Sequence, residues 1–365
     1  MVSIKSSGNW LSMIFVLFFA VGKGFAHDKL TIIPLFADEV NPSNIVTVAK
    51  SGGDFTDPIS AMASITNASA SNPYVIYIAP GVYELTPQGL VVKDYVSIVG
   101  AGIRSTILDG KVGDNSIAPT PFISTLTING HSEVSDVKIV NSGRGLQGAS
   151  VGTTILGENV EIKNVIIEVN TVSSTNIGLV VNQSSKLAAL DSVLVKVSQE
   201  TVSGAPVGIS FGGQKLEIKN SILDVSNTTN MLDSIGVFSY GLPDGESKLF
   251  LSNTNISTYS TEVDPSGLDI INTHANLYRV RVSSTDMLPI DAGGYGIRVL
   301  GSTVQIRDSI VEGGELSINT IETPQGPPSV KMANSQLIGG VIGTGYACFN
   351  NFDANYTAIS CPANE

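Results

Sequence analysis

Acidic and basic side chains crowd into one stretch of the second half of the chain, and these are the residues best suited to chemistry. Four aspartates and three arginines lie close together there: Asp264, Asp269, Asp286, Asp291, Arg279, Arg281 and Arg298. Acids that hold a calcium ion beside a basic group would support lyase chemistry. Asp269 and Arg298 occupy equivalent outward positions in successive sequence repeats, however, so an ion pair between neighbouring strands explains them better.

Other catalytic patterns are missing from the sequence. Hydrolysis by two neighbouring aspartates is not indicated, because the chain contains no adjacent Asp-Asp pair. His131 and His274 have no partners in a catalytic triad arrangement, and we interpret them as surface or turn residues. The sequence predicts no metal site and no cofactor; calcium is the one ion that the acids leave open.

The elements that must position these residues are internal repeats. One element reads Gly-apolar-x-apolar and begins at glycines that are 30, 28, 31 and 29 residues apart: Gly178, Gly208, Gly236, Gly267 and Gly296. A second element, apolar-x-apolar-x-Asn/Asp, ends at Asn164, Asp191, Asn220, Asn253, Asp308 and Asn334, with a shortened earlier copy at Asp136. One further copy is out of register, with Leu277, Val280 and Val282 at its apolar positions.

This alternation predicts short strands with one buried face, and such strands need the next repeat to cover them. The sequence therefore favours an all-β parallel β-helix of roughly nine coils. Its predicted buried column is Ile162, Ala189, Ile218, Leu251, Ile306 and Met332. The Asn and Asp residues would form a polar ladder at one corner. A propeller or sandwich is less favoured, because Asn-Gly and Asp-Gly hairpin turns are only isolated.

Both ends of the β-helix are expected to be covered. Asp57-Pro58 predicts the start of a short capping helix with Ile59, Met62, Ala63 and Ile65 on one face. We expect a signal peptide at 1–26, an extension at 27–44, the β-helix at 45–345, and a cap at 346–365. The only two cysteines, Cys348 and Cys361, predict a disulfide in that cap.

The first residues are typical of a secretion signal, with Lys5 before an apolar run at 11–21 and small residues at 24–26. We therefore predict a secreted protein, extracellular or periplasmic, that does not insert into membranes. Removal of Lys5 and Lys23 takes the net charge from −12 to −14. This acidity argues against nucleic acid as a partner and would repel acidic polysaccharides unless calcium bridged them.

Residues 45–56, 74–84, 96–102 and 105–108 run from the first strand through the capping helix to the first coils. Their order resembles the N-terminal part of plant and bacterial pectin methylesterases, and 125–129 and 134–141 extend the likeness. The resemblance implies the right-handed parallel β-helix of the pectin-lyase-like superfamily. It covers about a quarter of the chain. Its motifs build the cap and the first coils, so they indicate the architecture and give little information on catalysis.

The catalytic motifs of pectin methylesterases are not matched. That family places an acid in Gln-Asp-Thr-Leu and, one coil later, a nucleophilic aspartate in Val-Asp-Phe-Ile-Phe-Gly. The nearest segments here are 199–202 and 207–212, which are too close in sequence to stack on adjacent coils. Gly208 occupies the nucleophile position and already belongs to the glycine repeat. The catalytic residues are therefore unknown.

Two functions follow from these observations; a third, purely structural role also fits the repeats, but no anchor motif, coiled coil or second domain supports it. The first is a non-catalytic protein that binds a polysaccharide or a partner surface on the side of the β-helix with the longest connections, at 170–176, 198–205, 226–233, 258–265 and 283–294. The aromatic residues nearest to that side are the predicted ligand-binding residues: Phe238, Tyr240, Tyr259 and Tyr295. The alternative is a divergent pectinesterase-like or lyase-like enzyme, which acids clustered on one strip of the β-helix would favour.

Overall fold

The computed structural model describes residues 44–86, 89–111, 124–143, 149–171, 175–199, 204–228, 233–242, 247–261, 264–286, 293–324 and 326–359. These residues all belong to one compact unit, Asp38–Glu365. The predicted signal peptide at 1–26 and the extension up to residue 43 lie outside the described residues, so both stay predictions. No helix among the described residues is long and apolar enough to cross a membrane.

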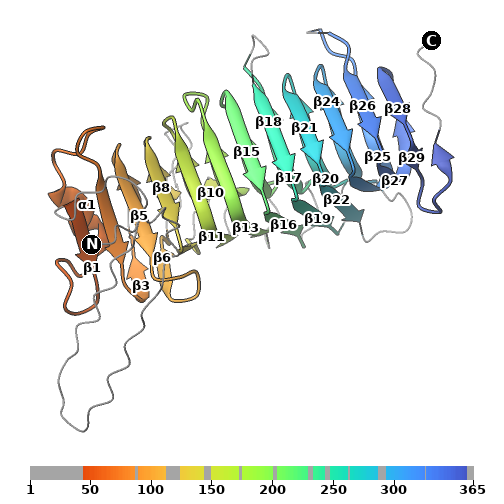
Figure 1. Cartoon of the computed structure of the whole chain (residues 1–365). Coiled ribbons are helices and arrows are strands. Elements are labelled where there is room, and N and C mark those ends of the chain that lie inside the picture. The colour runs from red at the N-terminus through yellow and green to blue at the C-terminus, as the bar shows by residue number, and fades with distance from the viewer. Residues whose placement is uncertain are drawn as a thin grey trace, which may run out of the picture. The chain divides into compact units, whose positions relative to one another are not determined.

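The fold is the predicted all-β parallel β-helix of about nine coils, with three parallel ladders of strands and one short helix (Figure 1). We number the ladders 1 to 3 in the order in which a coil passes through them. Ladder 1 contains β4 (Leu90–Val92), β7 (Ser124–Ile128), β10 (Ala149–Ile155), β12 (Thr175–Val181), β14 (Val207–Phe211), β17 (Ile235–Tyr240), β20 (Ser266–Ile271), β23 (Tyr295–Leu300), and the later parts of β25 (Ile310–Ile321) and β27 (Gln336–Ile342).

Ladder 2 contains the first strand of the β-helix. It contains β1 (Ile45–Val48), β2 (Tyr74–Ile78), β5 (Val96–Gly100), β8 (Ser132–Ser135), the first parts of β11 (Val160–Thr171) and β13 (Ala188–Gln199), β15 (Lys215–Lys219), β18 (Lys248–Ser252), β21 (His274–Tyr278), β24 (Thr303–Arg307), β26 (Ser329–Ala333) and β28 (Tyr346–Phe349). The strand β28 lies beyond the predicted end of the β-helix at residue 345.

Ladder 3 completes each coil. It contains β3 (Gly81–Glu84), β6 (Thr106–Asp109), β9 (Lys138–Asn141), the later parts of β11 and β13, β16 (Ile222–Asn227), β19 (Asn255–Ser260), β22 (Arg281–Asp286), the first parts of β25 and β27, and β29 (Asn351–Phe352). The short β30 (Ala358–Ile359) pairs antiparallel with β29 at the C-terminal end. The antiparallel pair breaks the parallel stacking and ends the ladder.

The glycine repeat has a steric cause in ladder 1. A Cβ atom on Gly178 would lie 2.6 Å from the carbonyl oxygen of Gly208, and one on Gly208 would lie 2.5 Å from that of Gly236. The same contact recurs at Gly152, Gly236 and Gly267. Each glycine therefore leaves room for the backbone of the next coil, and a side chain in this column would push two coils apart.

The corner between ladders 2 and 3 holds the predicted polar ladder. Its residues take a left-handed backbone conformation with positive φ: Asp136, Asn164, Ser192, Asn220, Asn253, Arg279, Asp308, Asn334 and Asn350. Asparagine tolerates this conformation better than most residues. The Nδ2 of Asn220 donates to Asp191 Oδ1 at 2.9 Å, and the Nδ2 of Asn253 donates to Asn220 Oδ1 at 3.3 Å, so the side chains also link successive coils.

Three details of the predicted register were wrong. Ile162 pairs with Leu190 and not with Ala189, so Leu190 occupies the buried column and Ser192, not Asp191, takes the left-handed corner position. The copy containing Leu277 is in register, with Arg279 at its corner.

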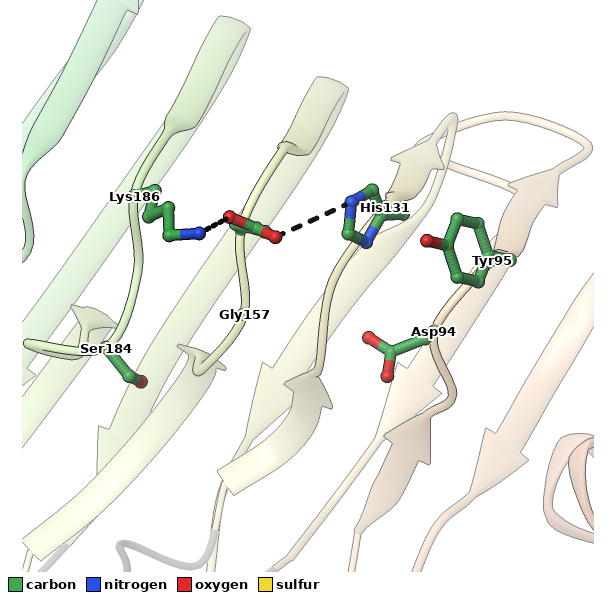
Figure 2. Close-up of a pocket in the computed structure, with 7 residues that line it drawn as sticks. Asp94, Tyr95, His131, Gly157, Ser184 and Lys186 are labelled. Atoms are coloured by element: carbon green, nitrogen blue, oxygen red, sulfur yellow. Dashed lines mark ion pairs between the residues drawn. The ribbon is translucent and has the colours of Figure 1, made fainter. Parts of the chain in front are cut away.

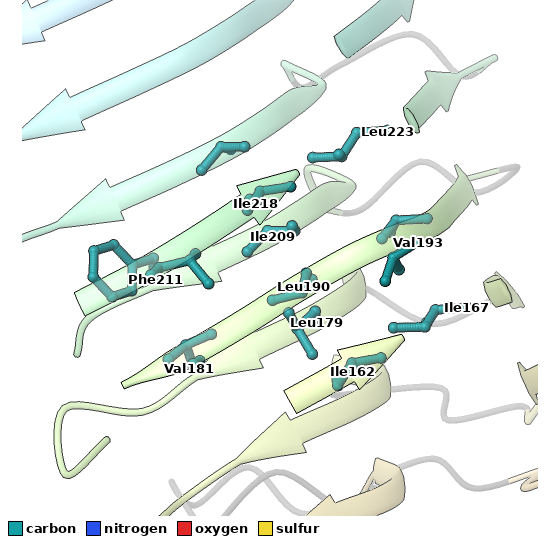
Figure 3. Close-up of a cluster of buried hydrophobic side chains, with 14 of the residues drawn as sticks. Ile162, Ile167, Leu179, Val181, Leu190, Val193, Ile209, Phe211, Ile218 and Leu223 are labelled. Carbon is teal, nitrogen blue, oxygen red and sulfur yellow. The ribbon is translucent and has the colours of Figure 1, made fainter. Parts of the chain in front are cut away.

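Figure 3 shows the apolar side chains, including Ile162, Leu190 and Ile218, pointing into the interior between the ladders.

The helix α1 (Pro58–Ser64) covers the N-terminal end, as predicted. Asp57 caps it by accepting a hydrogen bond from the backbone N–H of Ser60 at 2.7 Å. The prediction of its buried face was right for Met62 and Ile65 and wrong for Ala63, which is exposed, and for Ile59, which is 39% exposed; Pro58 and Ala61 are buried instead. Pro58, Ala61 and Met62 fit a helical face of spacing three and four, and that face closes the apolar interior.

Candidate functional site

Three of the four predicted ligand-binding aromatics lie on the outer face of ladder 1. Phe238 and Tyr240 project from β17 and Tyr295 projects from β23, whereas Tyr259 lies on β19 of the neighbouring ladder 3. The long connections that were predicted on one side all join ladder 3 to ladder 1, between strand pairs such as β16–β17 and β19–β20. The structure therefore places these residues along one side, and their role in binding stays a prediction.

Phe238 and Tyr240 form an aromatic pair. Their ring centroids are 5.5 Å apart with an interplanar angle of 32°. Phe238 packs against a second apolar cluster, separate from the interior, that contains Val180 and Val207. A Cβ atom on Gly212 of the preceding coil would lie 2.6 Å from the ring of Tyr240, so the ring rests directly on that glycine. Both rings are partly exposed and held by the coil before them.

The predicted ion pair between Asp269 and Arg298 is present. The Nε of Arg298 donates to Asp269 Oδ1 at 2.7 Å, and an Nη atom of Arg298 bonds the other carboxylate oxygen. The hydroxyl of Ser266 donates to the same Oδ1. Asp269 is only 3% exposed, and both its oxygens are bound, so this carboxylate is not accessible for attack on a substrate.

More acids surround this ion pair. Asp233 lies 3.9 Å from an Nη atom of Arg298, and burial raises the pKa of the Asp233 carboxyl more than Arg298 lowers it, with Asp264 and Asp269 adding to the increase. The guanidinium of Arg298 also lies 5.3 Å from the ring centroid of Tyr295. Burial raises the pKa of the Tyr295 hydroxyl, and the charge of Asp264 raises it further. Acids and one arginine therefore gather on one strip beside the aromatic pair.

The remaining residues of the predicted acid and arginine cluster lie elsewhere. Arg279 is at the corner between ladders 2 and 3, and Arg281 is on β22 with its Nη 3.9 Å from Glu312. Asp286 ends β22 in ladder 3. Asp291 lies outside the described residues. Within the part of the chain that is described, no group of three or more His, Cys, Asp or Glu side chains could hold a metal ion.

The described part of the segments nearest to esterase motifs, Gln199 and 207–212, contains no carboxylate. Gln199 is fully buried at the end of β13, and 200–203 lie outside the described residues. Gly208 belongs to the glycine column, as predicted. An esterase of this type needs a carboxylate at that position, and a glycine in contact with the next coil supplies none.

A polar pocket that the sequence did not indicate lies at the corner between ladders 1 and 2. It has a volume of about 360 Å³ and is lined by Asp94, Tyr95, His131, Gly157, Glu158, Ser184 and Lys186. Figure 2 shows Lys186, His131 and Tyr95 following one another along successive coils. Lys186 Nζ lies 2.6 Å from Glu158, and His131 Nε2 lies 3.9 Å from Glu158 on the other side.

The rings of Tyr95 and His131 stack in this pocket, with centroids 4.5 Å apart. Both residues have positive φ, which bulky side chains rarely adopt. A hydrogen bond from Lys186 lowers the pKa of Glu158, and the two side chains form an ion pair. The pocket joins residues from four coils, and only the stacking register brings them together. The sequence therefore offered no signal for it.

The two other sequence-predicted features lie away from these regions. His274 is exposed at the start of β21 in ladder 2. Cys348 lies on β28 and is not a free thiol. Cys361 lies outside the described residues, so its disulfide with Cys348 stays a prediction.

Comparison with known proteins agrees with this architecture. The chain is 12% identical to the solved structure of pectate lyase Pel9A, with a TM-score of 0.54 over 87% of this chain and 81% of that one. The chain has the pectin-lyase-like right-handed β-helix fold. A rice weevil pectin methyl esterase covers 88% of the chain and 92% of its own, at 12% identity and a TM-score of 0.45.

Sequence comparison reaches only a short segment. A probable pectinesterase/pectinesterase inhibitor of Arabidopsis thaliana is 40% identical over 77 residues, which are 20% of this chain and 14% of that protein. No family model matches the chain. The likeness to solved structures, at this level of identity, is a likeness of fold.

Proposed function

We propose that this chain is an exported, non-catalytic β-helix protein that binds a polysaccharide on the outer face of ladder 1. The observation that carries the proposal is the pair of Phe238 and Tyr240 beside the polar group of Tyr295 and Arg298. Aromatic rings offer an apolar surface to sugar rings, while the neighbouring polar groups bond hydroxyls. Export is supported by the signal-like pattern at residues 1–26.

The charges on this face favour a neutral polysaccharide. Arg298 is the basic group of the strip, and Asp269 already binds it through both oxygens. Asp233 and Asp264 add further acidic groups around it. A polymer with a carboxylate on every ring would be repelled by this balance of charge, whereas hydroxyl-rich neutral rings would not.

A binding measurement with matched variants tests the proposal. An array of neutral polysaccharides first identifies those that bind the wild-type protein. The variant Phe238→Ala/Tyr240→Ala should not bind these polysaccharides. Tyr356→Ala is the control, because Tyr356 is 78% exposed in the C-terminal segment away from ladder 1. Equal binding by wild type and double variant would show that the face is not the site.

A divergent hydrolase is the second candidate, and Asp233 is the observation that favours it. Its raised pKa suits a general acid, and the acids do gather on one strip, which was the arrangement expected of an enzyme. We rank the hydrolase second because the neighbouring carboxylate of Asp269 is buried and bonded to Arg298, so it cannot act as the second catalytic group. Turnover on methylated pectin, de-esterified pectin and xylan that disappears in Asp233→Asn would reverse the order of the two candidates.

A further inference from the structure

Basic side chains gather on the outer face of ladder 2 in the C-terminal half of the β-helix. From β15 onward, the strands of this ladder and their corners toward ladder 3 carry six basic residues: Lys215, Lys219, Lys248, Arg279, Arg307 and Lys331. The acids of the same strands and corners are Glu217 and Asp308. We call this surface the basic face. It is notable in a chain whose net charge is −12.

The charge changes sign along ladder 2. Before β15, acids match or exceed bases: Lys163 Nζ lies 3.0 Å from Glu133 and also pairs with Glu161. At β15, Glu217 is held between two lysines, with carboxylate to ammonium distances of 2.6 Å and 2.8 Å. Beyond β15, Lys248, Arg307 and Lys331 are exposed and make no ion pair with any described residue.

Aromatic rings hold several of these cations in place. Lys215 Nζ lies 5.3 Å from the ring centroid of Phe250. The guanidinium groups of Arg279 and Arg307 lie 4.8 Å and 5.9 Å from the ring centroid of Tyr278, which is 36% exposed. Such contacts orient a cation without neutralising it. Two like charges kept around one exposed ring indicate a surface prepared for an external anion.

The cations lie on successive strands of ladder 2, at different positions along each strand. Lys215 pairs with Lys248, and Tyr278 pairs with Arg307 in the next strand. Gln305, two residues before Arg307, pairs with Lys331. Neighbouring strands are about 4.8 Å apart, so the positive charges follow the axis of the β-helix. Asp244 and Glu246, which precede Lys248 in the sequence, lie outside the described residues.

We propose that the basic face binds an acidic polysaccharide, one with carboxylate or sulfate groups on its rings. Such a chain lying along ladder 2 would place successive anionic groups over successive coils. This surface and this ligand differ from those of the aromatic face of ladder 1. The net charge of −12 gives no indication of this face, on which the described strands and corners carry six basic residues and two acids.

Charge density favours a polysaccharide over a nucleic acid. Double-stranded DNA carries one negative charge per ~1.7 Å of its axis. The basic face offers about one cation per coil, which is a spacing of about 4.8 Å. Phe250 and Tyr278 are already engaged by cations, so stacking on unpaired bases, the usual mode for single strands, would require displacing them.

Titration with polygalacturonate and with dextran sulfate tests this inference, with neutral dextran as the control ligand. The wild type should bind at least one of the anionic polymers, more weakly as salt rises, and should not bind dextran. The triple variant Lys248→Gln/Arg307→Gln/Lys331→Gln should bind about tenfold more weakly, the order expected from losing three exposed charge contacts.

A matched variant controls for net charge. Lys138→Gln/Lys163→Gln/Lys196→Gln removes three lysines from the N-terminal half and should change affinity less than about twofold. The variant Phe238→Ala/Tyr240→Ala should bind the anionic polymers as the wild type does. Binding to the basic face can therefore be tested separately from binding of neutral polysaccharides to ladder 1. Equal losses in the two triple variants, no binding to either anionic polymer, or tighter binding to double-stranded DNA would each overturn the inference.

Discussion

The ion pair between Asp269 and Arg298 gives a sharp test of whether this strip of the β-helix is structural. Arg298→Met removes the partner of a carboxylate whose side chain is 4% exposed. Breaking a buried pair in this way costs about 3 to 5 kcal/mol, because the remaining charge is left unpaired. The double variant Asp269→Leu/Arg298→Met removes both charges and should lose about 1 kcal/mol or less relative to the wild type.

The variant Asp269→Leu should fall between these two. Arg298 keeps 24% of its side-chain surface exposed and lies 3.9 Å from Asp233, so it retains partial compensation. Urea unfolding followed by circular dichroism measures all four free energies by linear extrapolation. Hydrogen exchange at β20 and β23 shows whether the loss is local to these coils, as in other repeat proteins.

An Arg298→Met variant no less stable than the double variant would refute this expectation. Asp269 would then tolerate its charge without a partner, which means that water reaches it. An accessible carboxylate at this position would favour the hydrolase candidate over binding alone. Turnover measured on the same four proteins would decide that question.

Single contacts give three other predictions. Gly212→Ala should push the ring of Tyr240 aside and weaken neutral polysaccharide binding while leaving the unfolding free energy nearly unchanged, because the ring can swing outward; a large loss of stability would contradict this. Asn220→Ala should lower the free energy of unfolding by about 2 kcal/mol, and Asn220→Gly should lower it by about 1 kcal/mol, as measured by urea unfolding. Both variants lose the side-chain hydrogen bonds of Asn220. Only alanine also strains the left-handed backbone. Burial raises the pKa of Asp233 in the folded state, so its contribution to stability is full at acid pH and falls as pH rises through that raised value. Asp233→Asn should therefore be more stable than the wild type at pH 7 and not at pH 3, and unfolding at both pH values checks it.

The sequence predicted the repeat well where one steric requirement recurs. Gly178 and Gly208 face the backbone of the next coil, and nothing larger fits, so their spacing alone indicated the stacking. Asn220 and Asn253 indicated a corner because asparagine is favoured at positive φ. Both signals come from backbone geometry, because each geometry requires one residue type, glycine or asparagine, at the same place in every repeat.

Register failed where the local pattern is ambiguous. Ala188, Ala189 and Leu190 are all apolar, so alternation with period two cannot choose between them, and contact with Ile162 and Ile218 decides. Arg279 escaped notice at its corner because arginine is unusual there. At this corner the guanidinium group of Arg279 contacts the ring of Tyr278, which Arg307 of the next coil also contacts.

The candidate sites depend on register more than the fold does. Tyr95, His131 and Lys186 line one pocket although they are spread over four coils. The aromatic pair was accessible to prediction, because Phe238 and Tyr240 are two residues apart on one strand. The basic face was not, because adjacent members such as Lys215 and Lys248 are separated by a whole coil.

The glycine column of ladder 1 also limits how the length of this protein can change in evolution. One residue inserted within a strand of ladder 1 would move a side chain into the column, where its Cβ atom would lie 2.5 to 2.7 Å from the carbonyl oxygen of the next coil. Duplication of an entire coil of 28 to 31 residues would present another glycine and repeat the same contacts. Relatives of this chain should therefore differ by whole coils or in the connections between ladders 3 and 1, and rarely by single residues within these strands.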